Sequence, residues 1–470
     1  MRYGGSGLES TSVRLRTGLL VALLLLIAAV QDGLPQIGAP LLMQLVLLPF
    51  TAVFLYLSWR FLIGGEAPRW MTRVGGIDAV FAVVFLLELG FAVLFVGETG
   101  HYAGFGYKLR IVPVLILLVL PLGAVGLVTF RWRRIRPAWL VGTFLGTYAA
   151  AQVLAIVSFP LNYLRSDMLP VIVWAGRALL AGTNPYQHLH VADRIYDFPY
   201  LPGMILAFVP TQVLHLDPRW AAIAYIVGAM LLLYWAAAPE YRVQVAALIG
   251  LFVLCPYLQY RHDLYTQGHF FSLVLIFVLM QRSRFAWAAV AFGASMFISQ
   301  FSWVIFPFFL MNGLRRGGWR EVGRMALISG ATGVALMAPF LGSREGSIAH
   351  NAVGQWSELL RPIARPMNLA FWASYVVRPV NLKWVQLAIL TGIFCFCWAR
   401  GKCADLTDTL RWMLVALTVF LLLNVLVDGY FYLMLLVPML VYTVSANGWL
   451  RRGLEPTSPN RNVGNPALEG

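Results

Sequence analysis

Long apolar segments, interrupted by short basic loops, dominate the pattern of this chain. A membrane-spanning helix needs roughly 20 apolar residues, or fewer where neighbouring helices cover its ends. The candidate spans are 17–31, 37–62, 77–97, 109–130, 138–160, 200–215, 219–238, 244–258, 269–281, 286–311, 325–341, 383–399, 411–426 and 429–446. The pattern therefore predicts an all-α polytopic membrane protein with about 14 transmembrane helices.

The composition agrees with this fold class. Of the 470 residues, 60% are hydrophobic and 12% are charged, with a mean hydropathy of +0.75, whereas soluble domains carry roughly 25% charged residues. The net charge of +15 arises from 35 Lys and Arg against 20 Asp and Glu. Because basic residues concentrate at the cytoplasmic ends of spans, we assign this charge to membrane topology, and we expect membrane lipids and no nucleic acid as partners.

The basic loops set the expected orientation. The segments 14–16, 60–73 and 131–136 fall between alternate spans, which places the N-terminus in the cytoplasm and 161–199 outside. Lys108 and Arg110 fall outside in this scheme. The basic segment 315–324 is then cytoplasmic, and a second long polar segment at 342–381 lies on the same side as 161–199.

The region 200–311 leaves two topologies open. If all five of its candidate spans cross the membrane, Arg282 and Arg284 lie outside. If 286–311 is instead a hairpin of two half-helices around Gln300, those arginines move inside and another crossing is lost. Several candidate spans here are short, which indicates helices partly buried in protein or re-entrant.

A polar stretch at 165–202 concentrates the charge that is scarce elsewhere, with Asp167, Asp193 and Asp197 among its residues. Within it, apolar residues recur at helical spacing, namely Val171, Trp174, Ala175, Ala178 and Leu179. They predict a short amphipathic helix along the membrane surface that begins near Pro170 and stops at Gly182. His188 and His190 lie beside Asp193, but without a third His or Cys nearby we expect no metal.

Asp167 precedes the predicted helix and has two possible roles. Asp is a favoured helix N-cap, so Asp167 could serve only to cap the helix. The residue before a proline avoids helical geometry, however, so a start near Pro170 leaves Asp167 two residues too early for a cap. In the second interpretation Asp167 projects at the mouth of a cavity that the helix roofs.

The order of several short motifs resembles a known family. Asp167 and the amphipathic helix are followed by G-x-x-P-Y at 182–186 and F-x-Y-x-P at 198–202, and then by segments at 264–268, 296–307 and 367–369. This order is similar to that in the polyprenol-phosphate-mannose-dependent α-mannosyltransferases of the GT-C class, over roughly 140–445. The chain departs from the family at Gln300, where the family often has a lysine, which puts a charged role there in doubt.

The resemblance implies a GT-C-like transmembrane catalytic domain at 137–446, with short amphipathic helices on the extracytoplasmic face. Residues 1–136 then form an N-terminal transmembrane extension of about four helices, and 447–470 a basic, disordered cytoplasmic tail. The implied activity is a hexosyltransferase that moves a mannose-like sugar from a polyprenyl-phosphate donor to a lipid or glycan acceptor, with inversion. The protein would be multi-pass in the cell inner or plasma membrane, with its active site facing the periplasm or outside and no cofactor.

In this reaction the acceptor hydroxyl must lose a proton, and the resemblance gives the role of general base to Asp167. The leaving phosphate needs positive charge, for which Arg177, His350, Arg361 and Arg365 are candidates. The remaining candidates for substrate binding are Tyr186, Asp197, Tyr200 and Gln267. Each arginine could instead be an interfacial residue that extends to the headgroups, and Asp197 could pair with Arg194.

Two other classes of function stay open. A transporter or flippase of lipid-linked sugars would favour repeated halves, charges within the spans and broken helices. A non-catalytic assembly role is possible for 1–135 in particular. Long polar segments on one side, with few charges within the spans, favour the enzyme.

Overall fold

The computed structural model describes residues 134–159, 168–186, 200–254, 266–340, 383–424, 433–446 and 448–450, parts of 119–126 and of 189–198, and the single positions 161 and 258. The spans predicted at 17–31, 37–62 and 77–97, most of 109–130, and the polar segment 342–381 lie outside the described residues. All statements below concern the described part of the chain.

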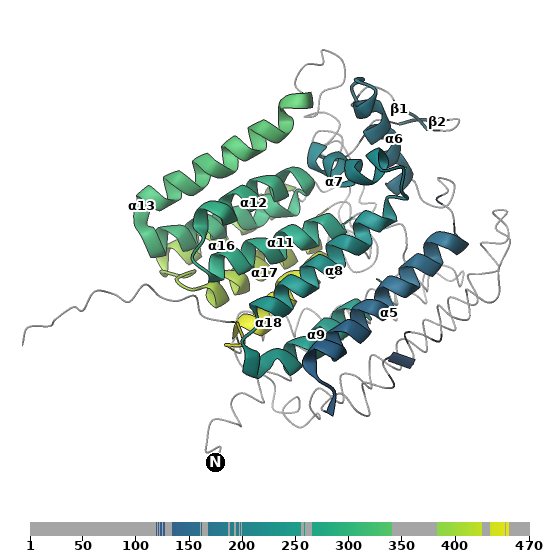
Figure 1. Cartoon of the computed structure of the whole chain (residues 1–470). Coiled ribbons are helices and arrows are strands. Elements are labelled where there is room, and N and C mark those ends of the chain that lie inside the picture. The colour runs from purple at the N-terminus through teal and green to yellow at the C-terminus, as the bar shows by residue number, and fades with distance from the viewer. Residues whose placement is uncertain are drawn as a thin grey trace, which may run out of the picture.

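The described chain is nearly all helical, as expected for an all-α protein, while the number of spans stays a prediction (Figure 1). Its α-helices are α5 (Pro137–Ser158), α6 (Met168–Leu180), α7 (Pro202–Val213), α8 (Arg219–Ala236), α9 (Arg242–Val253), α11 (Gln267–Gln281), α12 (Phe285–Ile298), α13 (Phe301–Met337), α16 (Lys383–Ala399), α17 (Leu406–Leu423) and α18 (Leu433–Ala446). Short 3-10 helices follow α8 (η5, Pro239–Tyr241) and α13 (η6, Ala338–Phe340).

Four of these helices are long and apolar enough to cross a membrane, namely α5, α8, α13 with η6, and α17. The other apolar helices have 12 to 17 residues. With the composition, this makes the chain a helical membrane protein.

One element is not helical and was not predicted. Strands β1 (Leu189–Val191) and β2 (Arg194–Tyr196) form an antiparallel hairpin, in which Leu189 faces Tyr196 and Val191 faces Arg194. Three-residue strands give too short an alternation to be recognised in the sequence. The hairpin lies next to α6 at one end of the bundle (Figure 1).

Contacts between helix termini define one end of the bundle, here called the basic end. The guanidinium of Arg282, after α11, lies 3.7 Å from the ring centre of Trp235 in the last turn of α8. Arg316 lies 5.8 Å from the ring centre of Phe285, which begins α12. Arg315 donates to the Trp398 carbonyl at the end of α16, 2.7 Å away. The loops at 237–242, 282–284, 315–320 and 399–405 therefore gather at the basic end.

The opposite end, here called the α6 end, is defined by equally specific contacts. Arg219, which begins α8, donates to the carbonyl of Phe159, which ends α5. The ring of Tyr186 lies 6.0 Å from that of Phe340, after α13. Helices α6 and α7 and the β1–β2 hairpin lie at this end (Figure 1).

The structure decides between the two topologies for 200–311, and it corrects one predicted span. Helix α7 does not cross the bundle. Its start at Gly203 packs against Phe297 near the end of α12, while the loop after it reaches Arg219 at the same end. At 12 residues α7 is only about 18 Å long. The crossing predicted at 200–215 is therefore wrong.

The segment 286–311 is indeed broken near Gln300. Helix α12 ends at Ile298, Ser299 is extended with φ −148° and ψ 134°, and α13 begins at Phe301. The break makes two passes across the bundle where one was predicted, and α7 makes none where one was predicted. Arg282 and Arg284 accordingly lie at the basic end with the segment 315–320.

Helix α13 is itself two legs joined at Gly318, whose φ of +71° and ψ of −169° only glycine adopts readily. The second leg runs back along α12, where the Ser329 hydroxyl donates to the Ala289 carbonyl over 2.9 Å. A Cβ on Gly293 would lie 2.5 Å from the Ser329 carbonyl oxygen. Small residues therefore allow these helices to approach closely, as is common in membrane bundles.

Candidate functional site

Helix α6 ends where the sequence predicts but begins earlier. After its last residue the Ala181 amide donates to the Arg177 carbonyl and the Thr183 amide to the Ala178 carbonyl, each over 2.9 Å. Gly182 has a φ of +75°, so the predicted stop is confirmed. The helix is already formed at Met168, where the described residues resume, so the start predicted near Pro170 is corrected to Met168 or earlier.

This earlier start changes the argument about Asp167. Met168 is already helical, so the helix starts no later than this residue, and Pro170 by itself does not exclude a capping role for Asp167. Asp167 itself lies outside the described residues. Capping and catalysis both stay open for it.

The buried face of α6 differs in one residue from the prediction. Val171 and Ala175 are buried as expected, but Trp174 is 41% exposed. Trp174 lies one turn before Arg177, whose guanidinium is 6.0 Å from the indole centre. The buried face was predicted from helical spacing alone, which cannot show where a large side chain turns. The Trp174 indole lines a groove beside the helix instead.

This groove lies between α6 and the α7–α8 loop and has a volume of about 640 Å³. Trp174, Leu180 and Leu216 give it an apolar wall, and all three are well exposed. Its polar side chains are Arg177, Gln212, His215 and Asp217. The groove thus offers both an apolar surface and polar groups, as an amphiphilic ligand requires.

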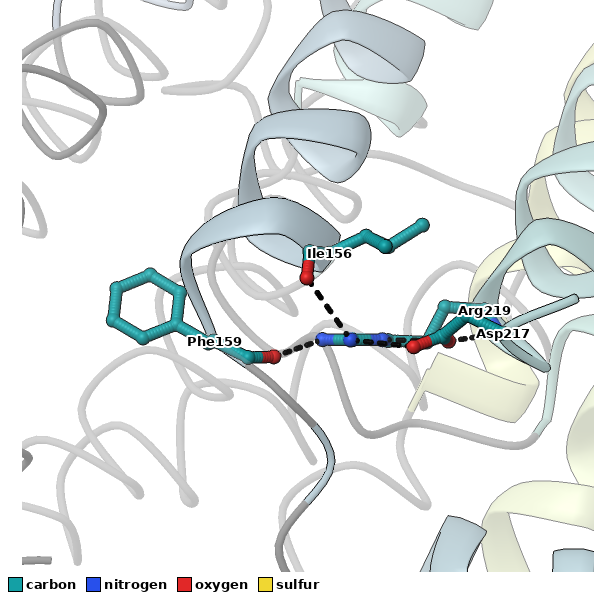
Figure 2. A network of polar contacts seen from close by, with 4 residues as sticks. All are labelled: Ile156, Phe159, Asp217 and Arg219. Atoms are coloured by element: carbon teal, nitrogen blue, oxygen red, sulfur yellow. Dashed lines mark hydrogen bonds and ion pairs between the residues drawn. The ribbon is translucent and has the colours of Figure 1, made fainter. Parts of the chain in front are cut away.

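Asp217 is already neutralised within the protein. Its two carboxylate oxygens accept from Nε and Nη2 of Arg219 over 2.9 and 2.7 Å (Figure 2). The other guanidinium donors of Arg219 reach the carbonyl oxygens of Phe159, at 2.6 Å, and Ile156, at 3.4 Å. This network joins the end of α5 to the start of α8, and it leaves Asp217 poorly suited to act as a base.

Gln212 is the groove residue whose hydrogen bonding is incomplete. Its side-chain amide packs against Gly176, where a Cβ would lie 2.3 Å from Nε2. Both Oε1 and Nε2 are buried and have no hydrogen-bond partner in the described part of the chain. Buried polar atoms are rarely left unpaired, and this amide could serve a ligand in the groove only if its side chain turned away from Gly176.

Two predicted substrate-binding residues, Tyr186 and Tyr200, occupy packing positions instead. Tyr186 is buried and donates its hydroxyl to the Tyr200 carbonyl over 2.8 Å, and burial raises its pKa. The rings of both tyrosines meet Phe198 edge-on, with centres 5.4 and 5.5 Å away. These contacts fix the segment that leads from α6 to α7, and contact with substrate stays a prediction for both.

Gln267 is not part of the groove. It begins α11, where its Oε1 and the neighbouring Thr266 hydroxyl are buried without a hydrogen-bond partner. Its contact with substrate stays a prediction, and among the predicted binding residues that the structure describes, only Arg177 lines the groove. Asp197, His350, Arg361 and Arg365 lie outside the described residues.

A buried polar cluster near Gln267 was missed by sequence reasoning. The Ser295 hydroxyl lies 2.9 Å from that of Ser272, 2.7 Å from that of Ser302 and 3.3 Å from Nδ1 of His269. All four side chains are at least 93% buried. Isolated hydroxyls within apolar runs were the available signal, but single serines are too common in spans to mark a site.

Among the described residues no group of three or more His, Cys, Asp or Glu side chains could hold a metal ion. Comparisons with known protein families, with curated proteins and with solved structures find no match for this chain.

Proposed function

We propose that this chain is a membrane glycosyltransferase that moves a mannose-like sugar from a polyprenyl-phosphate donor to a lipid or glycan acceptor at the extracytoplasmic face. The observation that carries the proposal is the amphiphilic groove beside α6, at the end of the bundle opposite the basic loops. Asp167 directly precedes this helix in the chain.

The orientation follows from charge. Arginines and lysines of short loops favour the cytoplasmic side, so the basic end faces the cytoplasm and the groove faces outward. Phe340, which packs on Tyr186, leads the chain into 342–381 at the α6 end. In this orientation both long polar segments start on the outer side, as a site for lipid-linked sugars outside the cell membrane requires.

The groove suits each part of the donor. The polyprenyl chain would lie against Trp174, Leu180 and Leu216, and Arg177 would hold the phosphate through its fork of donors. The unpaired Gln212 amide would bind sugar hydroxyls after its side chain turns from Gly176 toward the groove. Asp217 does not repel the phosphate, because Arg219 neutralises it.

The chemistry needs one base. Asp167 takes the proton of the acceptor hydroxyl while the acceptor oxygen bonds to the anomeric carbon of the sugar. The bond from that carbon to the phosphate oxygen breaks, with inversion, and polyprenyl phosphate leaves with the electron pair. General-base assistance contributes about 10²–10⁴-fold, and alignment of the reactants supplies much of the rest.

One observation favours a second class of function, a transporter or flippase of lipid-linked sugars. The α12–α13 break at Ser299 and Gln300 lies beside the buried cluster of His269 and Ser302. Broken helices and buried polar groups are typical of transport sites.

A single reconstitution separates the two classes. The full chain is placed in liposomes with polyprenyl phosphates that carry labelled mannose, glucose or arabinose, and with a candidate lipid acceptor fraction. A transferase releases polyprenyl phosphate and labels the acceptor. Intact donor that moves across the bilayer without release would overturn the transferase and support the flippase.

A further inference from the structure

A second cavity lies at the basic end, outside the site described above. It has a volume of about 400 Å³ and is bounded by the α11–α12 loop, the first turn of α12 and the kink of α13. Three arginines line it, Arg284, Arg316 and Arg324, together with Glu321. The arginines are exposed, so the cavity is open to a ligand from the surface.

The charge in this cavity is incompletely balanced. Glu321 lies 3.6 Å from Arg324, a distance too long for a strong ion pair, and it is the only carboxylate among the described residues that line the cavity. Three guanidinium groups thus face one carboxylate. Helix α12 begins at the wall of the cavity without a side-chain cap, which adds the positive end of its dipole. This arrangement calls for an anion, and arginine forks suit phosphate oxygens in particular.

The surroundings of the cavity distinguish a lipid from a soluble phosphate. Trp287 lines the cavity and is 66% exposed, and Trp319, beside the kink, is 69% exposed. Exposed tryptophans at the end of a membrane bundle mark the level of the lipid headgroups. Val290 lies one turn beyond Trp287 on α12 and is also exposed, which continues an apolar track from the cavity along the helix.

We propose that this cavity binds the phosphate headgroup of an anionic phospholipid, whose acyl chains follow Trp287 and Val290 along α12. Basic cavities between helices at the cytoplasmic side are known to favour anionic headgroups. The site lies at the opposite end of the bundle from the α6 groove, so it does not depend on the proposed sugar transfer.

The test compares two triple variants of the full chain in detergent by native mass spectrometry. One is Arg284→Gln with Arg316→Gln and Arg324→Gln, which removes the three positive charges that line the cavity. The other is Arg320→Gln with Arg400→Gln and Lys402→Gln, which removes the same charge from the same end outside the cavity. The probes are phosphatidylglycerol, zwitterionic phosphatidylcholine and water-soluble glycerol phosphate. Unchanged thermal unfolding establishes that both variants are folded.

We expect the cavity variant to bind phosphatidylglycerol on the order of tenfold more weakly than the parent, and the control variant to bind within about twofold. Phosphatidylcholine should bind the parent weakly, and glycerol phosphate should not displace the lipid. An equal loss in both variants, or none in the cavity variant, would overturn the proposal. Displacement by glycerol phosphate would also overturn it, in favour of a soluble phosphate ligand.

Discussion

At the scale of single residues, Arg219 shows how a buried charge is accommodated. Its side chain is only 3% exposed. The guanidinium is stable there because it donates to Asp217 and to the carbonyl oxygens of Phe159 and Ile156. The last carbonyl groups of a helix have no partner within it, and Arg219 donates to two carbonyl groups at the end of α5. The sequence offered no sign of this, since an Arg two residues after an Asp is an ordinary loop pattern.

Replacing Arg219 should therefore be costly. Arg219→Gln removes the counter-charge of the partly buried Asp217 and a hydrogen-bond donor from two carbonyl oxygens. We expect the free energy of unfolding to fall by about 3–5 kcal/mol. Thermal unfolding in detergent measures this as a lower Tm. Arg320→Gln, on an exposed position of α13, is the matched control and should leave the Tm unchanged. Equal Tm values for the two variants would show that the network does not hold α5 to α8.

Tyr186 allows packing to be separated from substrate binding. Tyr186→Phe keeps the ring among Phe198 and Phe340 and removes only the hydroxyl that donates to the Tyr200 carbonyl. We expect a loss of about 1 kcal/mol in the free energy of unfolding and an unchanged KM for the donor. A large rise in KM at unchanged stability would instead make the hydroxyl a substrate contact.

At the scale of elements, the sequence predicts helices well and their paths less well. The expected helices at 138–160, 219–238 and 383–399 appear as α5, α8 and α16 with nearly the same limits. Apolar runs of this length have few other stable forms in a membrane. The path of α7 could not be predicted, because 200–215 is as apolar as a true span, and only its packing against α6 and α12 shows that it stays at one end.

The contact of α7 with α12 depends on a small residue. A Cβ on Gly203 would lie 2.6 Å from the backbone carbonyl of Phe297, which cannot move without displacing α12. Gly203→Ala should therefore lower the Tm and the yield of folded protein. Gly146→Ala on α5, where a Cβ would meet no atom of the described residues within 4 Å outside its own helix backbone, should leave the Tm unchanged or raise it, because alanine favours the helix by about 1 kcal/mol. A Tm for Gly203→Ala as high as that of Gly146→Ala would contradict the close packing.

At the scale of the whole molecule, the positions of the basic loops resolve what local pattern left open. Counting the predicted spans could not place Arg282 inside or outside, because the count depends on which apolar segment of 200–311 fails to cross the membrane. In the structure α7 stays at one end of the bundle and the α12–α13 break adds one pass across it, so Arg282 lies at the same end as the basic segment 315–320. Of the candidate site, the sequence identified α6 and Arg177, but not the groove, whose other wall comes from the α7–α8 loop.

The proposed orientation can be tested by labelling single cysteines in intact cells. His215→Cys lies in the groove and Ser283→Cys at the basic end, each in a chain whose four native cysteines are replaced. A membrane-impermeant maleimide should label the first and not the second until the membrane is opened. Labelling of both from one side would contradict the arrangement of the two ends.

The central claim is that a carboxylate beside α6 removes the proton of the acceptor while the groove holds the donor. It is tested most directly by the rate of sugar transfer from labelled polyprenyl phosphates by Asp167→Asn, compared with the parent chain and with Asp193→Asn from the same polar stretch. We expect Asp167→Asn to lose about 10²–10⁴-fold in kcat, with its Tm close to that of the parent because Asn also caps helices, while Asp193→Asn retains activity. Transfer by Asp167→Asn at the rate of the parent would contradict the account.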